Sequence, residues 1–98
     1  MTRQDILDEL ASRGLKDTIF LDDPTFEDAI IGITEDGHLI YNYDSMVNNL
    51  VDNYVKEGLN EDEAYTSAIE WISYNTIRAI PYMKSYGKEP IIAYSFNS

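Results

Sequence analysis

Carboxylates give this sequence most of its capacity for chemistry, and they are unusually dense around one predicted turn and hairpin. The group comprises Asp22, Asp23, Glu27, Asp28, Glu35 and Asp36. Paired carboxylates can exchange protons in catalysis or hold Ca²⁺ or Mg²⁺. An EF-hand loop, however, requires oxygen ligands at fixed positions, glycine at the sixth and glutamate at the twelfth. Neither the stretch from Asp22 nor the one from Asn60 meets this spacing, so a solvated acidic turn is expected, with weak divalent binding as an alternative.

His38 is the single histidine and directly follows Glu35-Asp36-Gly37. General acid–base catalysis needs a titratable group inside a substrate cleft, whereas a histidine beside a turn is more often solvated. The chain has no cysteine, no glycine-rich phosphate loop and no nucleophile motif. We therefore expect no catalytic residues, no cofactor and no metal site, and hence no enzymatic activity.

The charge of the chain restricts its partners. Its 98 residues carry 18 acids and 7 bases, a net charge of -11, and residues 17–63 hold thirteen of the acids with a single base, Lys56. Such a charge disfavours direct binding to nucleic acid and to anionic membranes. Apolar runs such as Ala29–Ile31 are far too short to span a bilayer, and the first residues lack an apolar signal segment, so a cytoplasmic protein is expected.

A β-hairpin is the clearest local signal in the sequence. Two apolar runs, 29–34 and 38–43, are separated by Glu35-Asp36-Gly37, and Asp-Gly favours a two-residue type I′ turn. That turn pairs Ile33 with Ile40 and gives the hairpin two apolar faces. We therefore expect both faces to be covered.

Helical periodicity and capping signals account for most of the remaining chain. Thr2 and Asp5 form a capping box for a helix that ends near Gly14. A second helix is expected from a cap at Asp44 or Ser45 to Gly58, and a third from Asn60 until Pro81 ends or kinks it. The predicted fold is one α+β domain, residues 1–98, in the order α-β-β-α-α-β. Its small antiparallel sheet combines the hairpin 29–43 with a C-terminal strand 91–96 and packs against the helices.

Tyrosine is the second residue type that suggests recognition, because eight tyrosines in a chain of this length cannot all be buried. Tyrosine is enriched at protein interfaces, where it offers a large area and one polar group. Tyr74, Tyr82 and Tyr86 lie near the end of the third helix and in the loop after it. We expect these three to form an aromatic partner-binding surface.

Two segments carry a resemblance to known proteins. Residues 29–43, AIIGITEDGHLIYNY, and residues 70–82, EWISYNTIRAIPY, followed by Pro90-Ile91-Ile92, resemble a group of small acidic proteins of Firmicutes and their phages. The resemblance covers about residues 20–96, and Tyr74–Arg78 is its most specific part. The group has no assigned activity, so the resemblance implies a bacterial or phage context and no catalytic residues.

Two functional hypotheses remain. In the first, the chain is a protein-binding inhibitor or adaptor whose six clustered acids dock on a basic or nucleic-acid-binding surface of a partner. As a nucleic-acid mimic it requires those carboxylates to share one face at roughly the ~7 Å spacing of phosphates. In the second, the chain forms a homodimer through a tyrosine-rich sheet face or the edge of the last strand, and its acidity serves solubility.

Overall fold

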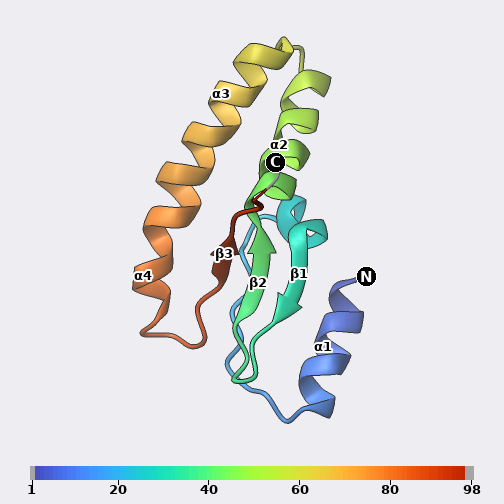
Figure 1. Cartoon of the computed structure of the whole chain (residues 1–98), viewed down its shortest axis with the longest axis vertical. Helices are drawn as coiled ribbons and strands as arrows, with labels where there is room; N and C mark the ends of the chain where they lie inside the picture. The colour runs from blue at the N-terminus through green and yellow to red at the C-terminus, as the bar shows by residue number, and fades with distance from the viewer. Residues whose placement is uncertain (1, 97–98) are drawn as a thin grey trace.

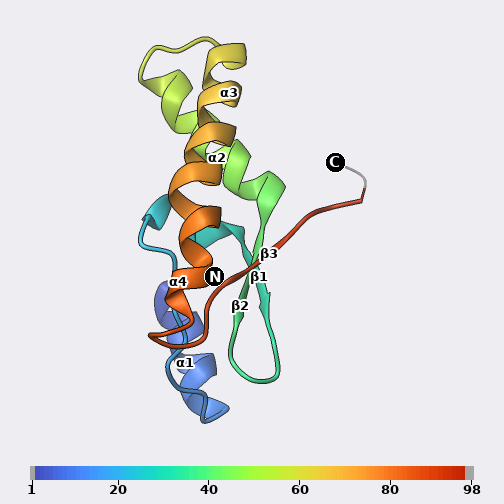
Figure 2. The ribbon, with the colours of Figure 1, turned by 90° about the vertical axis from the view of Figure 1, so that its left-hand side faces the viewer.

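A computed structural model describes residues 2–96, and it places a three-stranded sheet against helices that cover one of its faces (Figure 1, Figure 2). This arrangement confirms the predicted α+β class. The α-helices are α1 (Arg3–Ser12), α2 (Tyr43–Lys56), α3 (Glu61–Trp71) and α4 (Ile80–Met83). The other helical segments are η1 (Pro24–Ala29), η2 (Ile72–Thr76) and η3 (Ile77–Ala79), and the strands are β1 (Ile30–Ile33), β2 (Leu39–Asn42) and β3 (Ile91–Ala93).

The prediction of a purely antiparallel sheet is wrong, because the third strand makes the sheet mixed. β1 and β2 are antiparallel, but β3 lies parallel to β2, with Ile40 opposite Ile91 and Asn42 opposite Ala93. The connection explains this direction. α2 leads away from the end of β2, and the helical segments from α3 to α4 return beside it, so the chain re-enters the sheet at the end where β2 began (Figure 1). Because the helices carry the chain away from the sheet and back to the end where β2 began, β3 runs in the same direction as β2.

The hairpin forms where it was predicted, but with a different turn and register. Thr34 donates its N–H to the His38 carbonyl, so the loop has three residues and Ile33 lies opposite Leu39 rather than Ile40. Gly37, at φ 105°, supplies the left-handed position that a three-residue hairpin loop requires. The Thr34 hydroxyl accepts the His38 N–H and donates to Asp36, which favours this longer loop.

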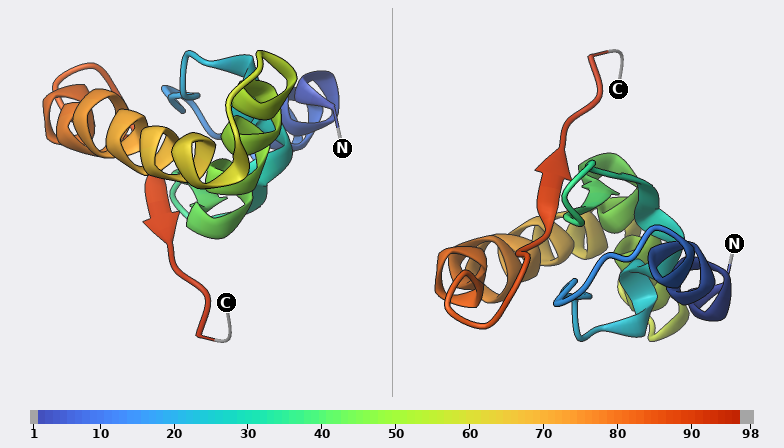
Figure 3. Two further views of the ribbon diagram at one scale, coloured as in Figure 1. Left: turned by 90° about the horizontal axis from the view of Figure 1, so that it is seen from above. Right: turned by 90° about the horizontal axis from the view of Figure 1, so that it is seen from below.

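This register decides which side of the hairpin is buried. Leu39 and Tyr41 point into the core, and a register irregularity between Ile30 and Gly32 leaves Ile31 61% exposed. The expectation that both faces of the hairpin would be covered is therefore wrong. The second face is open, and the segment after β3 runs away from the helices on that side (Figure 2, Figure 3).

Side-chain caps define the helix ends. Thr2 and Asp5 form the predicted capping box of α1, and the Asn60 side chain accepts the Glu63 N–H at the start of α3. The cap of α2 is Asn42, whose side chain accepts the Ser45 N–H, rather than Asp44 or Ser45 as predicted. Asn42 takes this role because the helix begins directly at the end of β2, and no turn intervenes.

The long helical stretch from α3 to α4 changes its winding twice. A π-helical turn, η2, precedes a 3₁₀ turn, η3, and the path then continues through Pro81 to Met83. Proline is accommodated because it occupies the first turn of α4, where its missing N–H has no intrahelical partner in any case. The π-turn alters which side chains face outward between Trp71 and Ile77.

One hydrophobic core joins the sheet to all the larger helices. Its fully buried side chains include Phe26, Leu39, Tyr41, Met46 and Ile72. The Tyr41 hydroxyl accepts the backbone N–H of Leu21 at 3.0 Å, which satisfies both buried groups, and burial raises the pKa of this phenol. Ala64 and Ala68 are completely buried and allow α3 to approach α2 closely.

Candidate functional site

The structure divides the six predicted partner-binding acids among three places. Asp22 and Asp23 lie in a hollow beside Trp71 and Met83, and the Asp23 side chain accepts the Thr25 N–H as the cap of η1. Glu27 and Asp28 precede β1, and Glu27 forms an ion pair with Arg3 at 3.0 Å. Glu35 and Asp36 lie in the hairpin loop, at the other end of β1.

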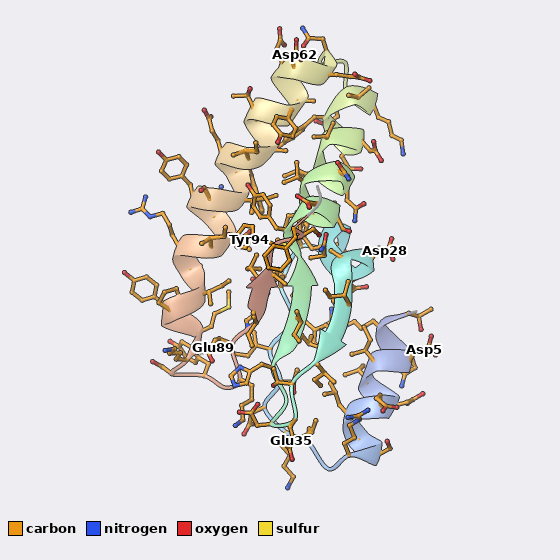
Figure 4. All side chains as sticks on the ribbon, viewed as in Figure 1. Asp5, Asp28, Glu35, Asp62, Glu89 and Tyr94 are labelled. Atoms are coloured by element: carbon orange, nitrogen blue, oxygen red, sulfur yellow. The ribbon has the colours of Figure 1, made fainter. Side chains whose placement is uncertain are left out.

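These three places lie on different elements and are separate from one another along the molecule. β1 alone separates Asp28 from Glu35 by about 13 Å, at ~3.3 Å per strand residue, and the two lie at different levels of the molecule (Figure 4). The structure therefore brings Glu27 near Asp28 and Glu35 near Asp36, but it does not bring all six together.

Asp36 takes part in a hydrogen-bonded cluster around His38. The hydrogen bond from the Thr34 hydroxyl, at 2.6 Å, lowers the pKa of the Asp36 carboxyl. The His38 ring is mostly buried, and its Nδ1 lies 2.7 Å from the Glu89 carbonyl oxygen and 3.1 Å from Glu89 Oε1. Its Nε2 lies 3.4 Å from Asp36 Oδ2. His38 thus connects the hairpin loop to the residue that precedes Pro90 and β3.

The burial of the Glu89 carboxylate makes its contact with His38 important for the stability of the folded state. Its Oε2 is buried and has no hydrogen-bond partner among the described residues, so His38 supplies the polar contact that the carboxylate does have. We expect His38→Ala to lower the free energy of unfolding by about 1–2 kcal/mol, because it leaves the Glu89 carbonyl and carboxylate without their donor. Urea denaturation followed by circular dichroism measures this change as a lower midpoint at constant slope.

His38→Asn is the matched control, because an asparagine amide can donate from nearly the position of Nδ1. It should recover more than half of the lost stability. A His38→Ala variant as stable as the wild type would show that solvent replaces this contact at no cost.

The three predicted interface tyrosines are all strongly exposed. Tyr74 is 65% exposed, Tyr82 77% and Tyr86 84%. Arg78 lies between the first two along the helical path, and its guanidinium carbon is 5.5 Å from the centre of the Tyr74 ring. We call Tyr74, Arg78, Tyr82 and Tyr86 the tyrosine surface. The π-turn η2 contains Tyr74, so the change in winding coincides with this surface.

A second exposed apolar area lies on the open face of the sheet, where sequence reasoning had suggested a self-association surface without identifying the residues that are exposed on it. Ile31 and Ile91 are exposed there, and Tyr94 packs on Tyr43 with ring centres 4.8 Å apart (Figure 4). Phe96, in the segment after β3, is fully exposed. Alternation along the hairpin predicted two apolar faces, and one of them is open. Ile31 lies at the register irregularity of β1 and is exposed, whereas Tyr41 is buried.

A groove lies between α1 and β1. Its volume is about 550 Å³, and its walls are mostly apolar side chains from both elements, with Glu9 and Arg13 on the helix side. Glu9 and Arg13 form an ion pair at 2.7 Å.

Residues 2–96 contain neither a metal-binding cluster nor a membrane-spanning helix. No three carboxylate or histidine side chains are arranged to hold a metal ion there. No helix in that range combines the length and the apolar character needed to cross a membrane.

Comparisons with known proteins assign no family to the fold or to these surfaces. The chain matches no known protein family, and it has no significant similarity to a curated protein or to a solved structure. The function of the chain must therefore be inferred from the surfaces described above.

Proposed function

We propose that this chain is a non-enzymatic protein-binding module that docks on its partner through the tyrosine surface. The observation that supports this proposal most strongly is the exposure of Tyr74, Tyr82 and Tyr86, which ranges from 65% to 84%. Tyr74 and Tyr82 lie on the helical stretch from η2 to α4, with Arg78 between them in the chain, and Tyr86 follows in the turn after α4. The other side of this stretch packs against the core through Ile72 and Ile77.

The chemistry of this surface is that of an interface centre. Tyrosine and arginine dominate the residues whose removal weakens protein complexes most, because each buries a large area and keeps a polar group for hydrogen bonding. The Arg78 guanidinium near the Tyr74 ring gives this pair a defined arrangement before any partner arrives. Preorganised side chains lose less conformational entropy on binding.

The acidity of the rest of the chain favours a basic partner. A net charge of -11 attracts positively charged proteins over distances longer than a contact and raises their encounter rate. The six acids singled out in the sequence lie in three separate places. The electrostatic attraction therefore comes from the summed field of the chain and does not require one acidic face. Binding should consequently weaken, without disappearing, as salt screens the field.

Affinity capture from cells that produce the protein tests the proposal. The baits are the wild type, a Tyr74→Ser/Tyr82→Ser double variant and a Tyr65→Ser control, since Tyr65 is also exposed but lies earlier on α3. The double variant should capture less partner than the wild type, by a factor of about ten or more. Two interface tyrosines together contribute more than about 1.4 kcal/mol to the binding free energy. Tyr65→Ser should capture as much as the wild type. Equal recovery by all three baits would refute a role for the tyrosine surface.

Self-association is a second candidate function, and the open sheet face favours it. Ile31, Ile91, Tyr94 and Phe96 are exposed on that side, and none of them is charged. Two copies with the same net charge meet most easily through uncharged surface. Light scattering after size exclusion decides between the two candidates: a mass near 11.2 kDa at all concentrations excludes the dimer, and a mass near twice that value supports it.

A further inference from the structure

The outer edge of β1 is a free strand edge. The sheet has the order β1-β2-β3, so β1 is paired on one side alone within the described residues. Thr34 directs its N–H toward β2, and backbone alternation therefore turns the N–H and C=O of Ile33 outward. A free edge of this kind can pair with a further extended segment.

The groove between α1 and β1 lies along this edge. Ile6 and the Glu9–Arg13 ion pair line it on the α1 side, and Ile30, Ile31 and Ile33 of β1 form the other wall. Its volume of about 550 Å³ is within the range of sites that bind ligands or short peptide segments. Gly32 lines the groove without a side chain, so another backbone can approach the strand closely at that point.

Acidic side chains lie at both ends of the same edge. Asp28 is exposed just before β1, and Glu35 is exposed just after it, in the hairpin loop (Figure 4). Neither carboxylate has a hydrogen bond or an ion pair within residues 2–96. Glu27, which is paired with Arg3, adds a third carboxylate at the first end. The edge thus combines an apolar middle with negative ends that lie at least about 13 Å apart, the length of β1 at ~3.3 Å per residue.

We propose that this edge binds an extended peptide segment of a partner protein, with apolar side chains in its middle and Lys or Arg at both ends. The segment adds a fourth strand beside β1, and main-chain hydrogen bonds to Ile33 hold it. Alternate side chains of the segment fill the groove against Ile6, and its basic ends meet Asp28 and Glu35. This site is separate from the tyrosine surface, so it does not depend on the function proposed above.

Charge favours such a partner over a second copy of the chain. In an edge-to-edge dimer, the acids at the ends of β1 would approach those of the other copy, and like charges in that position oppose pairing. A basic segment reverses the sign of this interaction. The choice of occupant therefore follows from Asp28 and Glu35.

A titration of the full chain with two synthetic peptides tests the proposal. The first peptide is KRVTVTVRK, and the second is SQVTVTVQS, both acetylated and amidated, so that the ends differ and the apolar middle does not. Backbone NMR signals and calorimetry follow each titration up to about 1 mM peptide. We expect saturable binding of the first peptide, with the largest shifts at Ile31, Gly32 and Ile33. The second peptide should bind at least about threefold more weakly.

A pair of variants at one position tests the strand pairing itself. Ile33→Pro removes the outward N–H and Ile33→Ala retains it, while both lose the isoleucine side chain. The proline variant should bind about tenfold more weakly than the alanine variant. Circular dichroism establishes that each is folded, and the two-peptide comparison on the wild type remains decisive if the proline variant is not.

Several results would overturn the proposal. These are no saturable binding of the basic peptide, shifts that map away from β1, or equal affinity for both peptides. Shifts of the same three amides on raising the protein concentration without peptide would instead identify a second copy as the occupant.

Discussion

Phe26→Ala is expected to lower the free energy of unfolding by about 3–5 kcal/mol, the largest loss from any substitution considered for this chain. Phe26 is 1% exposed, and its ring centre lies 5.9 Å from that of Trp71, so η1 is attached to the long helix through this contact. Truncation removes the transfer free energy of the ring and leaves a cavity that the packed core fills only partly. For a domain of this size the melting temperature should fall by at least about 12 °C.

Thermal and urea denaturation of the variant measure this loss directly. Tyr82→Ala is the matched control, because it truncates another aromatic side chain, one that is 77% exposed. The control should remain within about 0.5 kcal/mol of the wild type. Equal, small effects of both substitutions would show that Phe26 is not a core residue, and the packing of η1 described above would be incorrect.

Gly87→Ala is expected to cost about 2–3 kcal/mol, because a methyl group at this position would overlap the carbonyl oxygen of Asp17. That carbonyl accepts the N–H of Lys88 at 2.7 Å, and the Lys88 carbonyl accepts the N–H of Ile19 at 3.1 Å. Relieving the overlap separates these two segments and removes both hydrogen bonds. Since the segment at Lys88 leads directly into β3, hydrogen exchange at Ile92 should accelerate as well.

Gly32→Ala is the appropriate comparison for Gly87→Ala. A methyl group at Gly32 would meet the Ile40 side chain at 3.9 Å, an ordinary contact, so little loss of stability is expected. If the two alanine variants unfold at the same urea concentration, the close approach of the C-terminal segment to Asp17 does not contribute to stability.

Local signals in the sequence predicted the helices and the position of the hairpin. The capping box of α1, the Asn60 cap of α3 and the apolar runs on either side of Asp36-Gly37 all depend on neighbouring residues. Interactions of this range can be read directly from spacing and residue type. The α+β class followed from the same signals.

Two features depended on interactions that spacing does not contain. The hairpin register was determined by the Thr34 hydroxyl, which bonds both the His38 N–H and the Asp36 carboxylate and so favours a three-residue loop. The direction of β3 was determined by the return path of α3 to α4, which is a property of the tertiary arrangement. The register error changed which hairpin side chains were expected to share a face, since a one-residue register shift exchanges the faces of a strand.

The candidate sites were predictable to different extents. Exposure of Tyr74, Tyr82 and Tyr86 could be anticipated from their place at the end of a helix and in a loop. The separation of the six acids could not, because it depends on where η1 and the hairpin loop lie in space. The role of His38 against Glu89 was also hidden, since 51 residues separate them in the chain.

The most direct test of the proposed function is photo-crosslinking in cells that produce the protein. p-Benzoylphenylalanine replaces Tyr82 in one variant and Tyr65 in another, so that one crosslinker lies in the tyrosine surface and the other on a different part of the long helix. We expect a covalent product with a partner protein from position 82, with a much weaker one or none from position 65. Crosslinking at position 65 alone, or products that contain two copies of this chain, would contradict docking through the tyrosine surface.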